Sequence, residues 1–155
     1  MRRLGLGLVV MLGTVWLTGC ACCPTPTPSV FGILPHDRIE KALHDNPLGA
    51  TEDFKITTLD RDNTSSYHLV QLRTKERLHR HNMHDGKVLI WKGGGTLLLD
   101  GKPVTLKERD VVEIPRGVPH CFINESGGPT IAVVQFTPRL DGRDTEYLDG
   151  KSDRP

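Results

Sequence analysis

The sequence has few cysteines for disulfides and lacks the basic or aromatic clusters that bind nucleic acid, phosphate or sugar. Of its four cysteines only Cys121 lies beyond residue 23, so no disulfide can form within the part expected to fold. Lysine and arginine (20 residues) nearly balance aspartate and glutamate (19 residues) and form no basic block, which argues against nucleic acid as a partner. The sequence contains no arginine cluster for phosphate, no aromatic stripe for sugar and no internal repeat.

The N-terminal segment has the layout of an export signal. Two arginines precede an apolar run at residues 4–17, which is too short to span a membrane comfortably, and small residues follow. The stretch LTGC at residues 17–20 resembles the lipobox of bacterial lipoproteins. This resemblance implies that residues 1–19 are a signal peptide and that lipid on Cys20 anchors the protein in the bacterial cell envelope. The alternative is a plain signal or a short membrane anchor.

The remaining residues divide into a tether, a domain and a tail. Residues 20–30 are rich in Cys, Pro and Thr, which is typical of a stiff, extended tether. Ala21, in place of an aspartate, favours the outer membrane facing the periplasm if the bacterium has two membranes. Residues 31–138 suffice for one domain with one hydrophobic core, centred on about 54–138. Residues 139–155 are polar and rich in aspartate, which predicts a mostly mobile tail from which Tyr147 and Leu148 could dock.

One short helix and many short strands are expected within the domain. Residues 36–47 contain the helix candidate, because Asp37 can cap its start and Asn46-Pro47 ends it. From residue 54 onward, eight strand-like segments alternate with turn sequences, and Asp100-Gly101 is a strong hairpin signal. The pattern predicts an all-β domain, either an antiparallel sandwich or a small barrel, preceded by a short helix.

The histidines are clustered in a way that indicates a metal site. Four of the seven lie between His68 and His84, and His79 and His81 are two residues apart. On a strand this spacing puts both side chains on one face, where they could share one ion, whereas on a helix they would diverge by about 200°. An antiparallel all-β fold can bring His120 beside this pair.

Two motifs resemble those of single-domain cupins over about residues 66–137. The first is the His-x-His pair, which the family follows with an acidic residue and a glycine. The second is Pro-x-Gly-x-x-His-x-x-x-Asn, matched here by Pro115, Gly117, His120 and Asn124. The turn before the second motif departs once, because Arg109 stands where the family has glycine. The resemblance implies a cupin-type antiparallel β-barrel (a double-stranded β-helix or jelly roll). In that barrel His79, His81 and His120 would bind a divalent transition metal, with Fe, Zn, Mn, Ni and Cu not distinguished.

The fourth ligand is where the chain departs from the cupin pattern. The family's longer spacing puts the acidic position on Gly86, the shorter one puts it on Asp85, and His84 is also within reach. In the Gly86 register Val88 points into the barrel and Lys87 points outward. The Asp85 register would turn Lys87 inward beside the metal, at a cost in desolvation. A three-histidine site with open positions is therefore favoured, and a site that also uses Asp85 stays open.

Several other residues receive weaker interpretations. Gln71 and Gln135 lie on predicted strands that could line the cavity and contact a ligand. Cys121 directly follows a candidate ligand, so strand alternation should point it away from the metal, where it would pack as a small hydrophobe. Trp91 and Phe122 are expected to pack outside the barrel.

A cupin fold alone does not choose a function. The first hypothesis is an envelope-anchored protein that binds a divalent transition metal through three histidines, together with a small molecule, without turnover. The alternative is a metal-dependent enzyme, with a dioxygenase as the first choice. A second alternative is a metal-free cupin that serves as an interaction or dimerisation module, since a homodimer can form where two strand edges pair.

Overall fold

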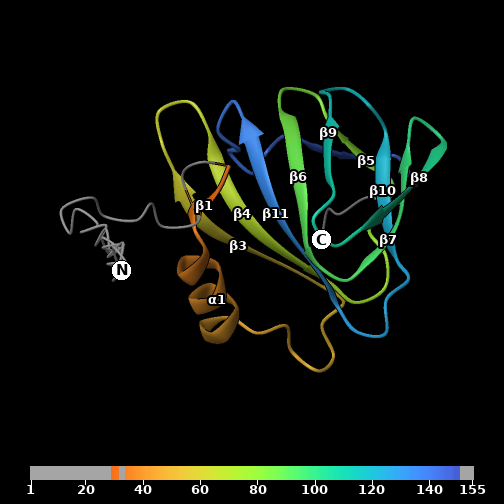
Figure 1. The fold of residues 1–155 in the computed structure, drawn as a ribbon. Coiled ribbons are helices and arrows are strands. Elements are labelled where there is room, and N and C mark those ends of the chain that lie inside the picture. The colour runs from red at the N-terminus through yellow and green to blue at the C-terminus, as the bar shows by residue number, and fades with distance from the viewer. Residues whose placement is uncertain (1–28, 32–33, 151–155) are drawn as a thin grey trace, which may run out of the picture.

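The computed structural model describes residues 29–31 and 34–150 (Figure 1). The predicted signal peptide at residues 1–19, the lipid on Cys20 and the tether up to residue 28 lie outside the described residues. Those three features therefore stay predictions. Within the described ranges, no helix is both long and apolar enough to cross a membrane.

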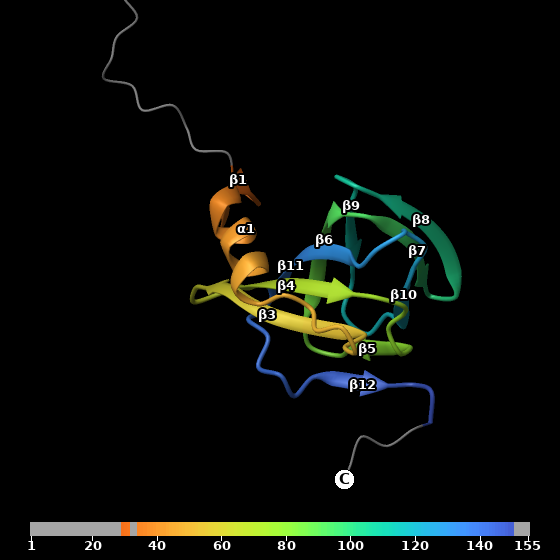
Figure 2. The same cartoon turned by 90° about the horizontal axis from the view of Figure 1, so that it is seen from below.

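Two antiparallel sheets of five strands each face one another and enclose the interior (Figures 1 and 2). One sheet has the strand order β3-β4-β11-β6-β9 and the other the order β12-β5-β10-β7-β8. The strands are β1 (Ser29–Val30), β2 (Leu34–Pro35), β3 (Phe54–Arg61), β4 (Ser66–Leu72), β5 (His79–His81), β6 (Asp85–Lys92), β7 (Gly94–Leu99), β8 (Lys102–Lys107), β9 (Val111–Ile114), β10 (His120–Asn124), β11 (Thr130–Thr137) and β12 (Thr145–Tyr147). The predicted all-β fold and all eight predicted strands are confirmed, whereas β5, β12 and the short β1-β2 pair were not among the predicted segments.

The predicted helix is present and lies outside the barrel, against β3 and β4 (Figure 2). Helix α1 spans His36–Asp45 and buries Ile39 completely. The expected cap at Asp37 is wrong, because Pro35 occupies the N-cap position and no side chain caps the helix. Proline suits the start of a helix, since its φ is already near the helical value and its missing N–H would have no partner there.

The sheet that contains β4 and β11 carries an apolar cluster on each face. The inner cluster lies between the two sheets and consists of Leu72, Ile90, Leu97, Leu106, Ile114, Phe122, Ala132, Val134 and Phe136. The outer cluster lies under α1 and consists of Leu34, Ile39, Leu59, Tyr67, Leu69, Ile131 and Val133. Because both faces of β11 are covered, its sequence is a continuous apolar run rather than an alternating one. A chain that starts at Ser29 keeps every residue of both clusters, so residues 29–155 contain the complete folding core.

Two turns that were singled out in the sequence have left-handed backbone conformations. Asp100 and Gly101 have φ of 51° and 73°, as expected for the tight hairpin between β7 and β8. Arg109 has φ of 74°, so it occupies the left-handed region in the turn where cupins have glycine. Its backbone N–H donates to the carbonyl of Ile90 at 2.8 Å, which holds the turn in place without glycine.

The prediction of a mostly mobile tail is wrong for residues 139–150, whereas the docking expected for Tyr147 and Leu148 is confirmed. Strand β12 pairs with β5 and forms the edge of the second sheet. Asp144 pairs with His84, both with side chains less than one-tenth exposed, and Glu146 pairs with Arg80. Both of these acidic residues have a basic partner about sixty residues earlier in the chain, so the local composition by itself resembles that of a solvated tail.

Candidate metal centre

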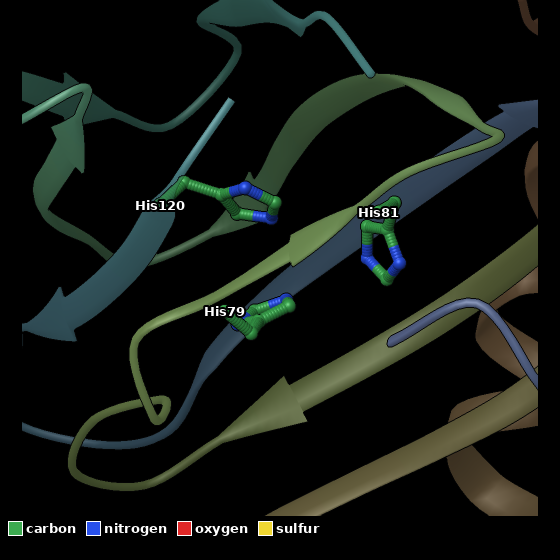
Figure 3. A group of neighbouring side chains, drawn as sticks. All are labelled: His79, His81 and His120. Atoms are coloured by element: carbon green, nitrogen blue, oxygen red, sulfur yellow. The ribbon is translucent and has the colours of Figure 1, made fainter. Parts of the chain in front are cut away.

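Two neighbouring strands bring three histidines to one wall of the barrel. His79 and His81 flank Arg80 on β5, so both side chains lie on one face of the strand. Strand β10 pairs antiparallel with β5, and His120 at its start is in register with His79. The three rings surround a common space (Figure 3) and line a cavity of about 510 Å³ between the two sheets.

The separations between the three rings suit a single ion. The ring centroid of His79 lies 5.1 Å from that of His81 and 4.3 Å from that of His120, and the other pair are 5.5 Å apart. Each ring offers a nitrogen within 4.8 Å of a nitrogen of the other two. Tetrahedral coordination places ligand nitrogens roughly 3.3 Å apart, a separation that small ring rotations would reach. The three histidines could therefore hold one metal ion.

Backbone carbonyls orient two of the imidazoles. Nδ1 of His79 donates to the carbonyl of Arg77 at 2.7 Å, and Nδ1 of His120 donates to the carbonyl of Val118 at 2.9 Å. A carbonyl oxygen only accepts, so Nδ1 carries a proton in both rings, and Nε2 is the nitrogen through which each ring could bind a metal. Metal-binding histidines are commonly oriented by such a bond from the nitrogen that does not bind the metal.

Burial keeps two of the rings neutral. His81 and His120 are 9% and 5% exposed, and burial lowers the pKa of each from 6.5 to about 4. The neighbouring His79 contributes part of this lowering in both rings. At pH 7 both imidazoles are in the neutral form that binds transition metals.

The other residues of the second motif position the strands rather than face the histidines. Gly117 has φ of 75° and donates its backbone N–H to the carbonyl of His81 at 2.7 Å, which ties the motif's turn to β5. Asn124 donates from Nδ2 to the carbonyls of Arg73 and Gly128, both at 2.8 Å. The motif therefore supplies one candidate ligand, His120, and the contacts that hold its strand in place.

The Gly86 register is the one observed, and Asp85 does not face the histidines. The Asp85 carboxylate accepts hydrogen bonds from the backbone and guanidinium of Arg116, which lower its pKa. Gly86 lines the cavity, whereas Lys87 pairs with Glu113 at 3.0 Å and lines no part of it. Asp85, the open candidate for a fourth ligand, thus forms a surface ion pair with Arg116. Gly86, which has no side chain, occupies the position where the family has an acidic residue.

His84 and His68 are also held away from the three-histidine group. His84 bonds through Nδ1 to the carboxylate of Asp144, and its Nε2 lies 3.2 Å from the carbonyl of Arg139. His68 on β4 is hydrogen-bonded to Ser66 at 2.9 Å, and burial lowers its pKa. Only the first two histidines of the cluster around residue 80 therefore contribute to the candidate site.

Neither predicted glutamine lines the cavity that contains the histidines. Gln71 ties β4 to the segment after α1, because its Nε2 donates to the carbonyl of Asn46 at 2.8 Å and its Oε1 accepts from the N–H of Leu48 at 3.1 Å. Gln135 donates to the hydroxyl of Tyr67 at 3.3 Å. Strand alternation explains both outcomes, since the residues beside each glutamine point into the cavity.

The aromatic and cysteine interpretations are confirmed in two cases of three. Cys121 is buried and does not line the cavity, and Trp91 packs on the outer face and donates to Glu40 at 3.0 Å. The expectation for Phe122 is wrong, because this residue lines the cavity. It is two positions from His120 on the same strand, so it shares that residue's face.

Sequence reasoning missed Glu76. This residue lines the cavity on the segment that leads into β5, and its Oε2 accepts from the backbone N–H of Phe122 at 3.2 Å. Burial raises its pKa, and nearby His79 partly opposes that shift. An acid three residues before the His-x-His pair was the only signal, and no strand was predicted there to give its direction.

A known protein family matches the part of the chain that contains all three candidate ligands. Residues 68–136 match the cupin domain family. A protein of Aquifex aeolicus (strain VF5), itself uncharacterized, is 34% identical over 97 residues, which are 63% of this chain and 79% of that protein.

Solved structures share the fold at low sequence identity. KdgF from Halomonas sp. has a TM-score of 0.57 and 18% identity, covering 63% of this chain and 91% of that one. A variant of Streptomyces PAC13 with uridine has a TM-score of 0.54 and 15% identity, covering 62% and 78%. An RmlC-like cupin from Shewanella frigidimarina has a TM-score of 0.53 and 17% identity, covering 60% and 83%. The fold and the two motifs agree with the match of residues 68–136 to the cupin domain family.

Proposed function

We propose that the protein binds one divalent transition metal through His79, His81 and His120, and a small molecule in the adjoining cavity. The observation that carries this proposal is the convergence of three imidazole nitrogens within 4.8 Å of one another on the cavity wall. Two of the rings are already oriented by backbone carbonyls with Nε2 left for the ion. Imidazole suits Fe, Zn, Mn, Ni and Cu, so the donor set does not select the metal.

The small molecule is expected to occupy coordination positions that the chain leaves open. Gly86 faces the cavity where other cupins place an acidic side chain, and Asp85 is paired with Arg116. A metal bound by three histidines would act as a Lewis acid toward an oxygen atom of the small molecule. The PAC13 structure with uridine supports the idea that a barrel of this fold can hold a small molecule.

The proposal places this site at the bacterial cell envelope. The lipobox-like stretch before Cys20 supports a lipid anchor, and the Pro- and Thr-rich residues after it support a tether that holds the barrel away from the membrane. If the bacterium has two membranes, Ala21 favours the outer one, facing the periplasm.

Metal content tests the proposal directly. Residues 29–155 are purified without chelators and analysed for Fe, Zn, Mn, Ni and Cu, with one ion per chain expected. His79→Ala and His120→Ala should each lose the ion, whereas His44→Ala should keep it because that side chain is 89% exposed on α1. Unchanged metal content in both cavity variants would refute the site. A chain that never holds metal and sediments as a dimer would support the interaction module instead.

A second candidate, a metal-dependent enzyme such as a dioxygenase, is favoured by Glu76. Its carboxyl group lines the same cavity as the histidines, where it could hold or transfer a proton during a reaction. Oxygen uptake by the iron-loaded protein on addition of a substrate, lost in Glu76→Gln with iron content unchanged, would support this candidate. Bound zinc without oxygen uptake would favour the binding protein.

A further inference from the structure

The cavity beside the histidines is apolar over most of its wall. It lies between the two sheets and has a volume of about 510 Å³, which falls within the usual range for small-molecule sites. Inward-facing aliphatic residues from β4, β6, β7, β9 and β11 line it: Val70, Val88, Ile90, Leu97, Val112 and Val134.

Apart from the hydroxyl of Thr130, the polar groups of the cavity lie on its histidine side, where Thr145 and Tyr147 of β12 also line it. Among the described residues, the charged ones that line it besides the histidines are Lys75, Glu76 and Arg77, three consecutive residues that lead into β5. Thr130 also lines the cavity, but its hydroxyl already bonds to Oδ1 of Asn124 at 2.7 Å. The wall opposite the histidines therefore offers almost no hydrogen-bond partner.

This distribution excludes ligands with polar groups all around. A hydroxyl buried against aliphatic side chains loses its hydrogen bonds to water and gains none, which is unfavourable. Nucleosides and sugars carry several such hydroxyls at opposite ends. An apolar body, in contrast, gains affinity with each methylene group removed from water.

We infer that the ligand of this site is an amphiphilic small molecule with an apolar body and its oxygen atoms at one end. The oxygen end meets the metal and the neighbouring Glu76, and the apolar body lies between the sheets. This inference rests on the proposed metal site for the placement of the oxygen end, whereas the placement of the apolar body depends only on the cavity.

Two homologous series test the inference on residues 29–155. The zinc-loaded protein is titrated with n-alkyl hydroxamic acids of increasing chain length, and the metal-free protein with n-alkanols. Each added methylene should tighten binding about fourfold in both series until the cavity is full. Uridine should bind much more weakly than the longer hydroxamic acids. Affinity independent of chain length in both series, or tight uridine binding, would overturn the inference.

The two ligand series distinguish failure of this inference from failure of the proposed metal site. If the chain holds no zinc but alkanols bind with the expected dependence on length, the metal site fails and the apolar cavity stands. If zinc binds at one ion per chain and neither series depends on length, the metal site stands and the ligand class is wrong.

Two neighbouring valines on β9 provide a matched pair of variants. Val112 lines the cavity, whereas Val111 is 54% exposed and does not line it. Val112→Phe should weaken binding of long-chain hydroxamic acids at least tenfold and leave acetohydroxamic acid unaffected, and Val111→Phe should change neither. The milder Val88→Leu, which adds one methylene on the adjacent strand β6 in register with Val112, replaces Val112→Phe if that variant does not fold. Equal effects of the inner and outer substitutions would contradict the placement of the apolar body.

Discussion

Acidification of the metal-free protein is expected to destabilise it well above the pH at which carboxylates titrate. Burial lowers the pKa of His81 and His120 from 6.5 to about 4 in the folded chain. Between these values the unfolded state binds more protons than the folded state, so stability falls as the pH falls from 6.5 toward 4. The stabilising contribution of the neutral rings is complete above pH 6.5 and is lost by about pH 4.

The magnitude follows from the size of the shift. One pKa unit corresponds to about 1.4 kcal/mol, so full protonation of one such histidine costs about 3 kcal/mol, of which about 2 kcal/mol is lost by pH 5. The two rings share His79 as a neighbour, so the joint loss at pH 5 should lie between about 2 and 4 kcal/mol. Glu76 acts in the opposite direction, because its pKa is raised by burial and protonation favours its folded form. Asp144 and Asp85 have lowered pKa values and lose their contributions only below about pH 4.

Urea unfolding of residues 29–155 in the presence of EDTA measures this effect. The free energy of unfolding is compared at pH 7 and pH 5 for the unchanged sequence, for His120→Gln and for the exposed control His44→Gln. His120→Gln should reduce the pH-dependent loss by about 2 kcal/mol, and the control should leave it unchanged. Saturating zinc should enlarge the loss, because the metal competes with protons for the same nitrogens and therefore binds the folded chain less tightly at pH 5 than at pH 7. If the free energy of unfolding falls between pH 7 and pH 5 by the same amount in His120→Gln as in the unchanged sequence, the reasoning is refuted.

Four other substitutions test separate parts of the structure. Gly86→Glu should fold, because an added Cβ lies 3.8 Å from its nearest neighbours, and should raise zinc affinity about tenfold or more by supplying a fourth ligand, measured by competition with a chelator; unchanged affinity would contradict the Gly86 register. Arg109→Gly should stabilise the protein by up to about 1 kcal/mol in urea unfolding, because it relieves a φ of 74°; a clear loss of stability would show that the Arg109 side chain matters more than its backbone. Asp144→Ala should destabilise by about 3 kcal/mol, because it leaves buried His84 without its partner, whereas exposed Asp141→Ala should be nearly neutral; equal effects would mean that the C-terminal segment is only loosely attached. Cys20→Ser should abolish labelling by a fatty-acid probe in cells, and undiminished labelling would contradict the lipid anchor.

The sequence predicted that His79 and His81 lie on one face, beside His120, because strand periodicity is a local property. A spacing of two residues puts His79 and His81 on one face of any strand, whatever the rest of the fold. The same rule places Phe122 inside the barrel, since it is two residues from His120, so the expectation that Phe122 packs outside conflicted with the strand periodicity. The Gly86 register was also favoured correctly, because a lysine beside a metal is costly in any fold.

The predictions that failed depended on partners far away in the chain. Asp144 and Glu146 looked solvated because the histidine and the arginine that pair with them lie about sixty residues earlier. Gln71 and Gln135 could not be assigned a direction until β4 and β11 were paired and their inner faces defined. Glu76 lies outside any predicted strand, so no periodicity indicated where its side chain points.

The sequence by itself determined the strand pattern, the cupin motifs and the three candidate ligands, because these follow from backbone periodicity and residue type over short distances. Only the tertiary structure decided how many protein groups face the candidate metal position and what surrounds it. Those features depend on which strands pair and in which register, and pairing depends on long-range contacts that bury both faces of β11 and attach β12 to β5. The apolar lining of the cavity is likewise assembled from strands of both sheets that are scattered along the chain, and no single stretch of sequence contains it.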